Sequence, residues 1–293
     1  MTFIVATFYH FFDFRKYAES RQSLNQLLDA EEIKGSLLIA AEGINGTLSG
    51  RRAAIDRVLT YLKEEVVGGE FEHKESVCDR QPFGRAKVRL KKEVISLGEQ
   101  VRHPRLVRGS QATQHDDSRS PNESGMTAGR YVEPKNWNTL IADSEVTVLD
   151  ARNSYEIHLG TFERAIDPKT RTFKELPAYV KKHFDPGTHK HIATFCTGGI
   201  RCEKFSAWLL AQGFENVYQL RGGILKYLEE IPAQENKFRG ECYVFDERVA
   251  VGHGLTSSLT ASQCPACGHA LTAQDRVHAL YIEGKRCRFC KTE

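Results

Sequence analysis

The chain has 293 residues, of which 40% are hydrophobic and 27% are charged, and its formal net charge is +3. This length allows two domains and a small third one, and the ordinary composition argues against intrinsic disorder of the whole chain. The weak net charge excludes a uniformly basic nucleic-acid-binding protein, so the distribution of charge along the chain has to be considered instead.

The first residues predict a strand and not a targeting segment. The apolar start MTFIVATFYHFFDF has no basic residue before it and no small-residue cleavage site after it. Nowhere does an apolar stretch approach the roughly 18 residues that a membrane helix requires. We therefore expect a cytoplasmic protein that makes no membrane contact.

Residues 1–107 are predicted to form an N-terminal α+β domain with the order β-α-β-β-α-β. The expected strands are 3–8, 35–41, 71–77 and 87–96, the expected helices are 15–28 and 51–64, and residues 47–49 are expected to be extended after a turn at 42–46. This order is typical of a ferredoxin-like, acylphosphatase-type sandwich. Because no catalytic motif lies in it, the simplest interpretation is a packing or binding module.

Residues 108–130 are polar and rich in serine and glycine, which predicts a linker. Strands and helices then alternate over residues 131–231, and this predicts an α/β domain with a parallel sheet. The expected strands are 146–150, 191–195 and 217–220, and the expected helices are 174–183, 203–212 and one that follows Gly223. Residues 232–293 form a C-terminal extension.

One loop of the α/β domain carries a candidate reactive cysteine. It lies between a predicted strand and a predicted helix, and its residues are Cys196, Thr197, Gly198, Gly199, Ile200 and Arg201. Backbone N–H groups at a helix N-terminus point into one concavity, and the two glycines permit the necessary curvature. These dipoles would hold the Cys196 sulfur as a thiolate, and Arg201 would attract an anionic group of a substrate. The alternative is an inert core cysteine that ends a strand.

Cys202 follows this loop directly. A second thiol next to a reactive cysteine could resolve a disulfide or a sulfenate formed there. Packing of Cys202 within the first turn of the helix is the simpler interpretation, and both possibilities stay open.

Residues 146–230 resemble a rhodanese domain. The resemblance rests on the strand Val146–Asp150, the following Ala151-Arg152-Asn153-Ser154-Tyr155-Glu156, the six-residue cysteine loop and the pair Gly222-Gly223 after the third strand. It implies that Cys196 accepts sulfane sulfur as a persulfide. It also implies that Asp150 and Arg152 form the structural ion pair that supports the active site.

Three segments extend the resemblance over nearly the whole chain. They are Glu42-Gly43-Ile44-Asn45-Gly46-Thr47, Cys196-Thr197-Gly198-Gly199-Ile200-Arg201-Cys202-Glu203-Lys204 and Val244-Phe245-Asp246-Glu247-Arg248-Val249. Together they resemble the rhodanese-containing tRNA uridine hydroxylases, which form 5-hydroxyuridine at wobble position 34 with molecular oxygen. The resemblance implies an oxygen-dependent oxidoreductase whose partner is the anticodon stem-loop of tRNA.

Four of the eight cysteines form two C-x2-C pairs, Cys264 with Cys267 and Cys287 with Cys290, separated by nineteen residues. Two such pairs at this spacing indicate a zinc ion bound by four thiolates. A closed set of four sulfur ligands leaves no position for a substrate, so the zinc would be structural and would stabilise a segment with little core of its own. The alternative is four free thiols.

The strongest local charge lies between Arg80 and Arg108, where nine basic residues face two acidic ones and give a net charge of +7. Such a patch can bind phosphate backbones, although a solvated strand face is the ordinary explanation. Because the resemblance implies tRNA, we expect RNA contacts from Arg85, Lys87, Arg89, Lys91, Lys92, Arg102, Arg105 and Arg108.

The sequence offers no organic redox cofactor for a hydroxylation. No G-x-G-x-x-G follows a strand, and we find no flavin, nicotinamide or haem signature. Cys196 remains, as a thiolate or persulfide that adds to C6 of uracil so that oxygen adds at C5. Two other functions stay open: a sulfurtransferase that passes persulfide sulfur to a small thiophile or a tRNA, and a non-catalytic RNA-binding adaptor on a rhodanese scaffold.

Overall fold

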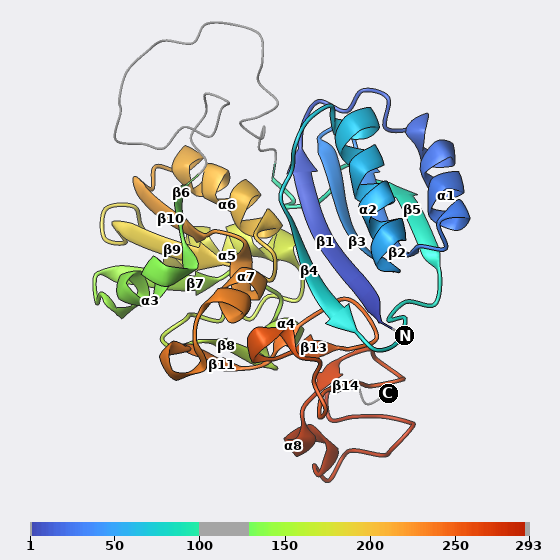
Figure 1. Cartoon of the computed structure of the whole chain (residues 1–293). Helices are drawn as coiled ribbons and strands as arrows, with labels where there is room; N and C mark the ends of the chain where they lie inside the picture. The colour runs from blue at the N-terminus through green and yellow to red at the C-terminus, as the bar shows by residue number, and fades with distance from the viewer. Residues whose placement is uncertain (1, 100–128, 291–293) are drawn as a thin grey trace, which may run out of the picture.

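The computed structural model describes residues 2–99 and 129–290. Most of the predicted linker and three predicted RNA-binding residues, Arg102, Arg105 and Arg108, lie outside the described residues. Figure 1 shows a sheet domain, blue to cyan, beside an α/β domain, green to orange, with the red C-terminal extension below both of them.

The first part of the chain forms a five-stranded sheet with two helices on one face (Figure 1). Its elements are β1 (Phe3–Phe11), α1 (Ser20–Ala30), β2 (Lys34–Ala40), β3 (Gly43–Gly50), α2 (Arg52–Tyr61), a π-helical turn (Leu62–Val67), β4 (His73–Cys78) and β5 (Ala86–Leu90). The strand order is β4-β1-β3-β2-β5, and all neighbours are antiparallel except the parallel pair β2 and β5. This confirms the predicted ferredoxin-like arrangement.

The predicted turn at 42–46 is too long, because the turn comprises only residues 41 and 42 and β3 already begins at Gly43. Gly43 has φ +137°, and a Cβ there would lie 2.0 Å from the carbonyl oxygen of His10 on the neighbouring strand. The glycine therefore serves close strand pairing and not a turn.

The predicted strand 87–96 is also too long, because β5 ends at Leu90. Beyond that residue the Val94 amide donates to Glu42 Oε1 at 2.8 Å, and Leu97 packs in the core of the α/β domain. The apolar residues of this segment therefore do not form a longer strand: Val94 packs on the first domain, and Leu97 packs in the α/β domain.

The two faces of strand β1 have different partners, as the two-residue period of a strand requires. Ile4, Ala6 and Phe8 pack with α1 and α2 in the core of the sheet domain. Thr7 and Tyr9 lie on the opposite face, which is directed at the α/β domain. Strand β4 runs alongside β1 and places Lys74 opposite Thr7.

The second part of the chain has a four-stranded parallel sheet, which confirms the predicted α/β architecture. Its strand order is β6-β10-β9-β7. The elements are β6 (Arg130–Val132), α3 (Pro134–Ala142), β7 (Val146–Asp150), α4 (Ser154–Ile157), β8 (Gly160–Phe162), a 3-10 turn (Phe173–Glu175), α5 (Leu176–His183), β9 (His191–Phe195), α6 (Ile200–Ala211), β10 (Asn216–Leu220) and α7 (Gly223–Glu230).

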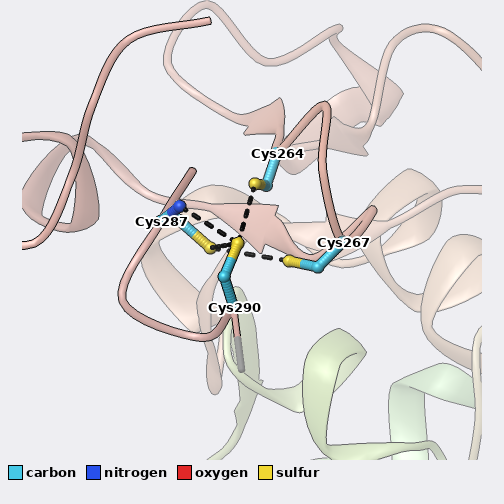
Figure 2. A group of neighbouring side chains, drawn as sticks. All are labelled: Cys264, Cys267, Cys287 and Cys290. Carbon is cyan, nitrogen blue, oxygen red and sulfur yellow. Dashed lines mark hydrogen bonds between the residues drawn. The ribbon is translucent and has the colours of Figure 1, made fainter. Parts of the chain in front are cut away.

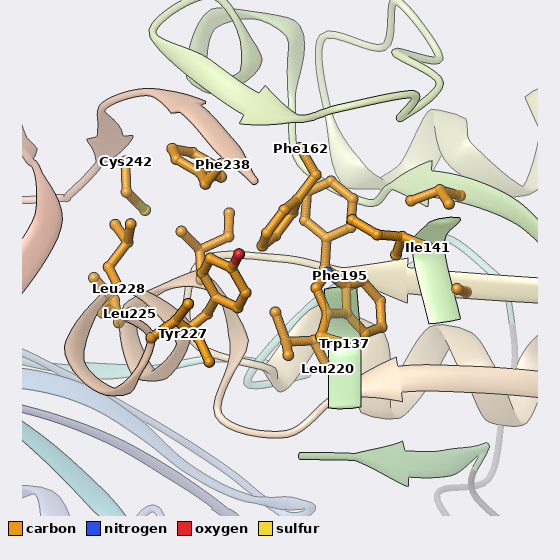
Figure 3. Packing of buried hydrophobic residues seen from close by; sticks show 14 of the residues in the cluster. Trp137, Ile141, Phe162, Phe195, Leu220, Leu225, Tyr227, Leu228, Phe238 and Cys242 are labelled. Carbon is orange, nitrogen blue, oxygen red and sulfur yellow. The ribbon is translucent and has the colours of Figure 1, made fainter. Parts of the chain in front are cut away.

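Helices cover both faces of this sheet and create two cores. Residues of α3 and α7 pack on one face, and residues of α5 and α6 pack on the other. Figure 3 shows the first core, in which Phe162 is central. The centroid of its ring lies 4.8 Å from the ring centroid of Phe195, 4.7 Å from that of Tyr227 and 5.2 Å from that of Phe238. Edge-to-face aromatic contacts of this kind fix the strand β9 that leads to Cys196.

The C-terminal extension connects the two domains. Its elements are two 3-10 turns (Ala233–Glu235 and His253–Leu255), β11 (Phe238–Gly240), β12 (Cys242–Tyr243), β13 (Ala250–Val251), β14 (Ser262–Gln263), β15 (Ala270–Leu271) and α8 (Ala273–Arg276). Strand β11 pairs with β8 of the α/β domain. Arg248, held by Asp246 at 2.6 Å, donates to Ser76 of β4 at 2.7 Å. In the described parts of the chain, no helix combines the length and apolar character of a membrane span.

A buried lysine fastens the sheet domain to the helix after the cysteine loop. Lys204 of α6 is 1% exposed, and its Nζ lies 3.1 Å from both carboxylate oxygens of Glu42 and 2.9 Å from the Ile95 carbonyl. Glu93 is a further partner. Removing one partner of a buried ion pair typically costs about 3–5 kcal/mol, so this contact resists separation of the domains.

Candidate active site and metal centre

Cys196 lies directly after β9, and two helix N-termini meet around it. Helix α6 begins at Ile200, three residues earlier than predicted, because Gly199 with φ +106° starts the helix. The Gly199 N–H donates to Cys196 Sγ at 3.1 Å. The N–H of Ile224 in α7 donates to the Cys196 carbonyl at 2.9 Å, and a Cβ on Gly223 would lie 2.5 Å from that carbonyl oxygen. The pair Gly222-Gly223 therefore permits a close approach of α7 to the loop.

The surroundings of Cys196 favour its thiolate form. Burial alone would raise the pKa of this thiol, but a hydrogen bond from the Cys202 thiol, the positive charge of Arg201 and the backbone N–H groups of Cys202 and Gly199 together lower it to about 5. The sulfur is therefore ionised at neutral pH. Cys202 responds in the opposite sense, because burial and the neighbouring thiolate raise its pKa well above the usual value.

Arg201 is engaged by an acid that sequence reasoning did not identify. Its guanidinium binds Glu156 in a bidentate ion pair with distances of 2.5 and 2.7 Å, and both side chains are buried. Burial would raise the pKa of Glu156, but Arg201 lowers it below the usual value. The only local signal was the spacing from Asn153 to Glu156, a capping box at the start of α4. The predicted binding of a substrate anion by Arg201 stays a prediction.

The other predicted supporting residues also lie at the loop. Asp150 and Arg152 are fully buried and form a bidentate ion pair with distances of 2.9 and 2.6 Å. Arg152 also donates to the Gly160 carbonyl at 2.6 Å. Cys202 lies in the first turn of α6 and packs in the same buried cluster as Cys196. Its resolving role stays a prediction.

The open face of the N-terminal sheet covers the cysteine loop. Lys74 of β4 donates to the Gly198 carbonyl at 3.2 Å, and the Tyr9 hydroxyl of β1 lies 3.0 Å from the position of a Cβ on Gly199. Cys196 is 0% exposed. A cavity of about 360 Å³ lies beside the loop, and Tyr9, Lys74, Tyr131, Glu203, Arg221 and Gly222 are among its lining residues. No pattern in the sequence predicted that the first domain contributes to this site.

The five predicted RNA-binding residues that the structure describes lie away from the cysteine loop. Arg85, Arg89, Lys91 and Lys92 are exposed along and after β5, and Lys87 is half-buried. The pKa of Lys87 is lowered, first by the positive charge of Arg85 and then by partial burial and the charge of Arg89. Positive charge is therefore crowded along this strand. Strand β5 is the opposite sheet edge from β4, which contacts the cysteine loop. Four strand spacings of about 4.8 Å place the two edges about 19 Å apart.

The C-terminal cysteines form a site that could hold a metal ion (Figure 2). The sulfur of Cys264 lies 3.6 Å from that of Cys290, and the sulfur of Cys267 lies 3.6 Å from that of Cys287. All four sulfurs lie within 4.8 Å of one another. A tetrahedral zinc ion with sulfur ligands at about 2.3 Å requires sulfur separations of about 3.8 Å, which these values match.

A buried carboxylate and several ring contacts attach the cysteine cluster to the α/β domain. Asp275 of α8 is 1% exposed and lies 2.6 Å from His158 Nε2 and 2.9 Å from Arg288 Nε. The ring of His269, which follows the first cysteine pair, stacks on the ring of Phe289, which lies within the second pair, with 3.8 Å between the ring centroids. The two C-x2-C segments are therefore also held in place by side chains other than the four cysteines.

Comparisons with known proteins agree with this geometry. Residues 3–94 match the family described as UPF0176 acylphosphatase like domain, and residues 133–230 match the Rhodanese-like domain. These matches, with the observed sheets, establish an acylphosphatase-like first domain and a rhodanese second domain. A protein of Picosynechococcus sp. named tRNA uridine(34) hydroxylase is 44% identical over 289 residues, which are 98% of this chain and 90% of that protein.

Solved structures resemble single domains of the chain. A rhodanese-related protein of Thermoplasma volcanium is 25% identical and covers 34% of this chain and 92% of its own, with a TM-score of 0.28. An acylphosphatase of Coxiella burnetii is 11% identical and covers 30% of this chain and 93% of its own, with a TM-score of 0.24.

Proposed function

The chain belongs to the tRNA uridine(34) hydroxylase family, and we propose on this premise that it hydroxylates C5 of uridine 34 in tRNA, with Cys196 as the reactive group. The observation that carries the proposal is the complete cysteine loop, in which Gly199 N–H donates to a sulfur with a pKa of about 5. A non-catalytic adaptor would not need an ionised thiol between two helix N-termini.

The chemistry begins with addition of the Cys196 thiolate to C6 of the uracil. The S–C6 bond forms, the C5–C6 π electrons move towards C4, and an enolate results whose C5 is nucleophilic. Oxygen then reacts at C5, and loss of the C5 proton with expulsion of the thiolate restores the ring. Uridine, one O2, two electrons and two protons give 5-hydroxyuridine and water. The two electrons come from a reductant outside this chain.

Nucleoside analysis tests this function. We expect 5-hydroxyuridine and its derivatives to disappear from the tRNA of a deletion strain and to return with the wild-type gene. The Cys196→Ser gene should not restore them. Persistence of these nucleosides in the deletion strain would refute the hydroxylase. Loss of a thiolated nucleoside instead would favour the persulfide sulfurtransferase, which the same loop chemistry would serve.

We further propose the setting of this reaction. The four C-terminal cysteines bind a structural zinc ion, because their sulfur separations fit a tetrahedral site. The anticodon stem-loop is the macromolecular partner, and the enzyme acts in the cytoplasm, where tRNA is. The functional units are residues 1–107, 131–231 and 232–293, joined by the linker 108–130.

The basic strand should govern tRNA binding without taking part in the chemistry. Replacing Arg85, Arg89 and Lys92 together by glutamate removes three exposed cations at the sheet edge opposite the cysteine loop. We expect tRNA affinity to fall by about tenfold or more, and the slope of log K against log salt to decrease by about 2–3, because each phosphate contact releases counterions. Binding isotherms at several salt concentrations measure both effects.

A matched variant separates this effect from net charge. Lys135, Arg171 and Lys182 are exposed on the α/β domain, and their replacement by glutamate changes the total charge by the same amount. Affinity should stay within about twofold of the wild type for this control. Equal losses in the two triple variants would mean that β5 is not the RNA-binding surface.

A further inference from the structure

The cavity beside the cysteine loop has walls from both domains. Tyr9 and Lys74 come from the open face of the N-terminal sheet, and Glu203, Arg221 and Gly222 come from the α/β domain. The buried contact of Lys204 with Glu42 holds these walls together. A pocket with converging polar groups at a domain boundary is the usual form of a small-ligand site.

Lys74 places a positive charge at the cysteine loop. Its Nζ donates to the Gly198 carbonyl at 3.2 Å, and within residues 2–99 and 129–290 it forms no ion pair. Burial lowers the pKa of Lys74, while the charges of Glu72 and Cys196 oppose that effect. An ammonium group has three protons, so at least one remains for an oxygen atom of a ligand in the cavity.

Tyr9 lies between the cavity and the loop. It lines the cavity, and its hydroxyl lies 3.0 Å from the position of a Cβ on Gly199, whose N–H holds the sulfur. The carboxylate of Glu203, which is 2% exposed, lies near enough to this hydroxyl to act on it electrostatically. Burial, together with the negative charge of Glu203, raises the pKa of Tyr9 well above its usual value. The phenol therefore keeps its proton at neutral pH.

We propose that this cavity binds the extruded uracil ring of the target nucleotide, that Lys74 donates to the enolate oxygen at C4, and that Tyr9, which lines the cavity together with Glu203, delivers and removes the proton at C5. The inference rests on the proposed function. The base leaves its stack to enter, and the Tyr9 ring turns aside so that C6 reaches the sulfur. The N-terminal domain is then part of the catalytic site and not only a packing module.

The addition step needs no oxidant, and this makes the inference testable alone. The S–C6 bond forms, and the electron pair moves onto the C4 oxygen, which Lys74 holds. Tyr9 then gives its proton to C5, so that the C4 carbonyl forms again and a Tyr9 phenolate is left. In the reverse direction the Tyr9 phenolate removes the other C5 hydrogen, the S–C6 bond breaks to return the uracil and the thiolate, and the Tyr9 hydroxyl exchanges that hydrogen with water. Without oxygen, the enzyme therefore exchanges the hydrogen at C5 with water.

The experiment uses the full chain and an anticodon stem-loop that carries tritium at C5 of uridine 34, under nitrogen. The wild type should release tritium to water. Lys74→Met should slow the release by about 100-fold, as expected for a lost oxyanion donor, and Lys74→Arg should recover part of it. Tyr9→Phe should slow it by about 10- to 100-fold. Stem-loop affinity and melting temperature should stay close to those of the wild type.

Two variants with the same chemical changes elsewhere provide controls. Lys237 pairs with Glu163 away from the cavity, and Tyr17 lies in the core of the sheet domain. Lys237→Met and Tyr17→Phe should exchange tritium at the wild-type rate. Wild-type rates in Lys74→Met and Tyr9→Phe would overturn the inference. A wild type that hydroxylates in air but exchanges no tritium without oxygen would overturn it too, while a wild type that does neither would refute the proposed function itself.

Discussion

Replacement of Cys196 by serine should reduce 5-hydroxyuridine formation by about three orders of magnitude or more, with the fold intact. The Gly199 N–H and the Arg201 charge that stabilise a thiolate at pKa about 5 are far too weak to ionise a serine hydroxyl at neutral pH. Formation of 5-hydroxyuridine in isolated tRNA, measured by nucleoside mass spectrometry, gives the activity. Unfolding curves of the variant should match those of the wild type.

Cys78→Ser is the matched control, because Cys78 is also buried but lies in β4 of the other domain. It should retain wild-type activity. Unchanged turnover in Cys196→Ser would refute the assignment of the nucleophile. Loss of activity in Cys78→Ser as well would point to a general effect on the fold.

The pH dependence of the wild type gives a second measure of the same sulfur. Because the pKa of Cys196 is lowered to about 5 and the thiolate is the reactive form, the rate should fall as pH drops through about 5. It should be level from about pH 6 to neutrality. A rate that instead rises up to pH 9, as for an ordinary thiol, would show that the loop does not ionise the sulfur.

Cys264→Ser should remove the metal and unfold the C-terminal knuckles. One of four sulfurs within 4.8 Å of one another is lost, and a tetrahedral thiolate site cannot be completed. Zinc supplies about 10–16 kcal/mol of apparent binding energy to small metal-dependent modules, far more than the short strands β14 and β15 provide. The measured zinc content should fall from one ion per chain to none, and a protease should cleave the variant within residues 261–290.

The rest of the chain should stay folded in this variant, because both domains have their own buried cores. Chelation of the wild type should reproduce the proteolysis pattern. Thr260→Ser, outside the cluster, is the control and should keep its metal. A wild-type protein purified without zinc and resistant to the same protease would show that the cysteines act as free thiols.

Sequence reasoning identified most of the fold and about half of the site. The hydrophobic periodicity of strands and helices predicts both sheets. The glycines within 42–46 are predicted to form a turn, but they allow β3 to pair closely with β1. The start of α6 was placed at Glu203 and lies at Ile200. The first error arises because glycines serve close strand pairing as well as turns, and the second because Gly199 starts the helix within the cysteine loop.

By itself the sequence determined the chemical groups that lie close together in the chain: the loop from Cys196 to Arg201 and the two cysteine pairs. Their geometry follows from a single turn of backbone, so spacing is sufficient. Only the tertiary structure decided that Glu156 pairs with Arg201 across 45 residues, that Lys74 reaches Gly198 across 124, and that Lys204 binds Glu42 across 162. Such contacts depend on which faces of two domains meet, and that is set by packing of the whole surface and not by any local pattern.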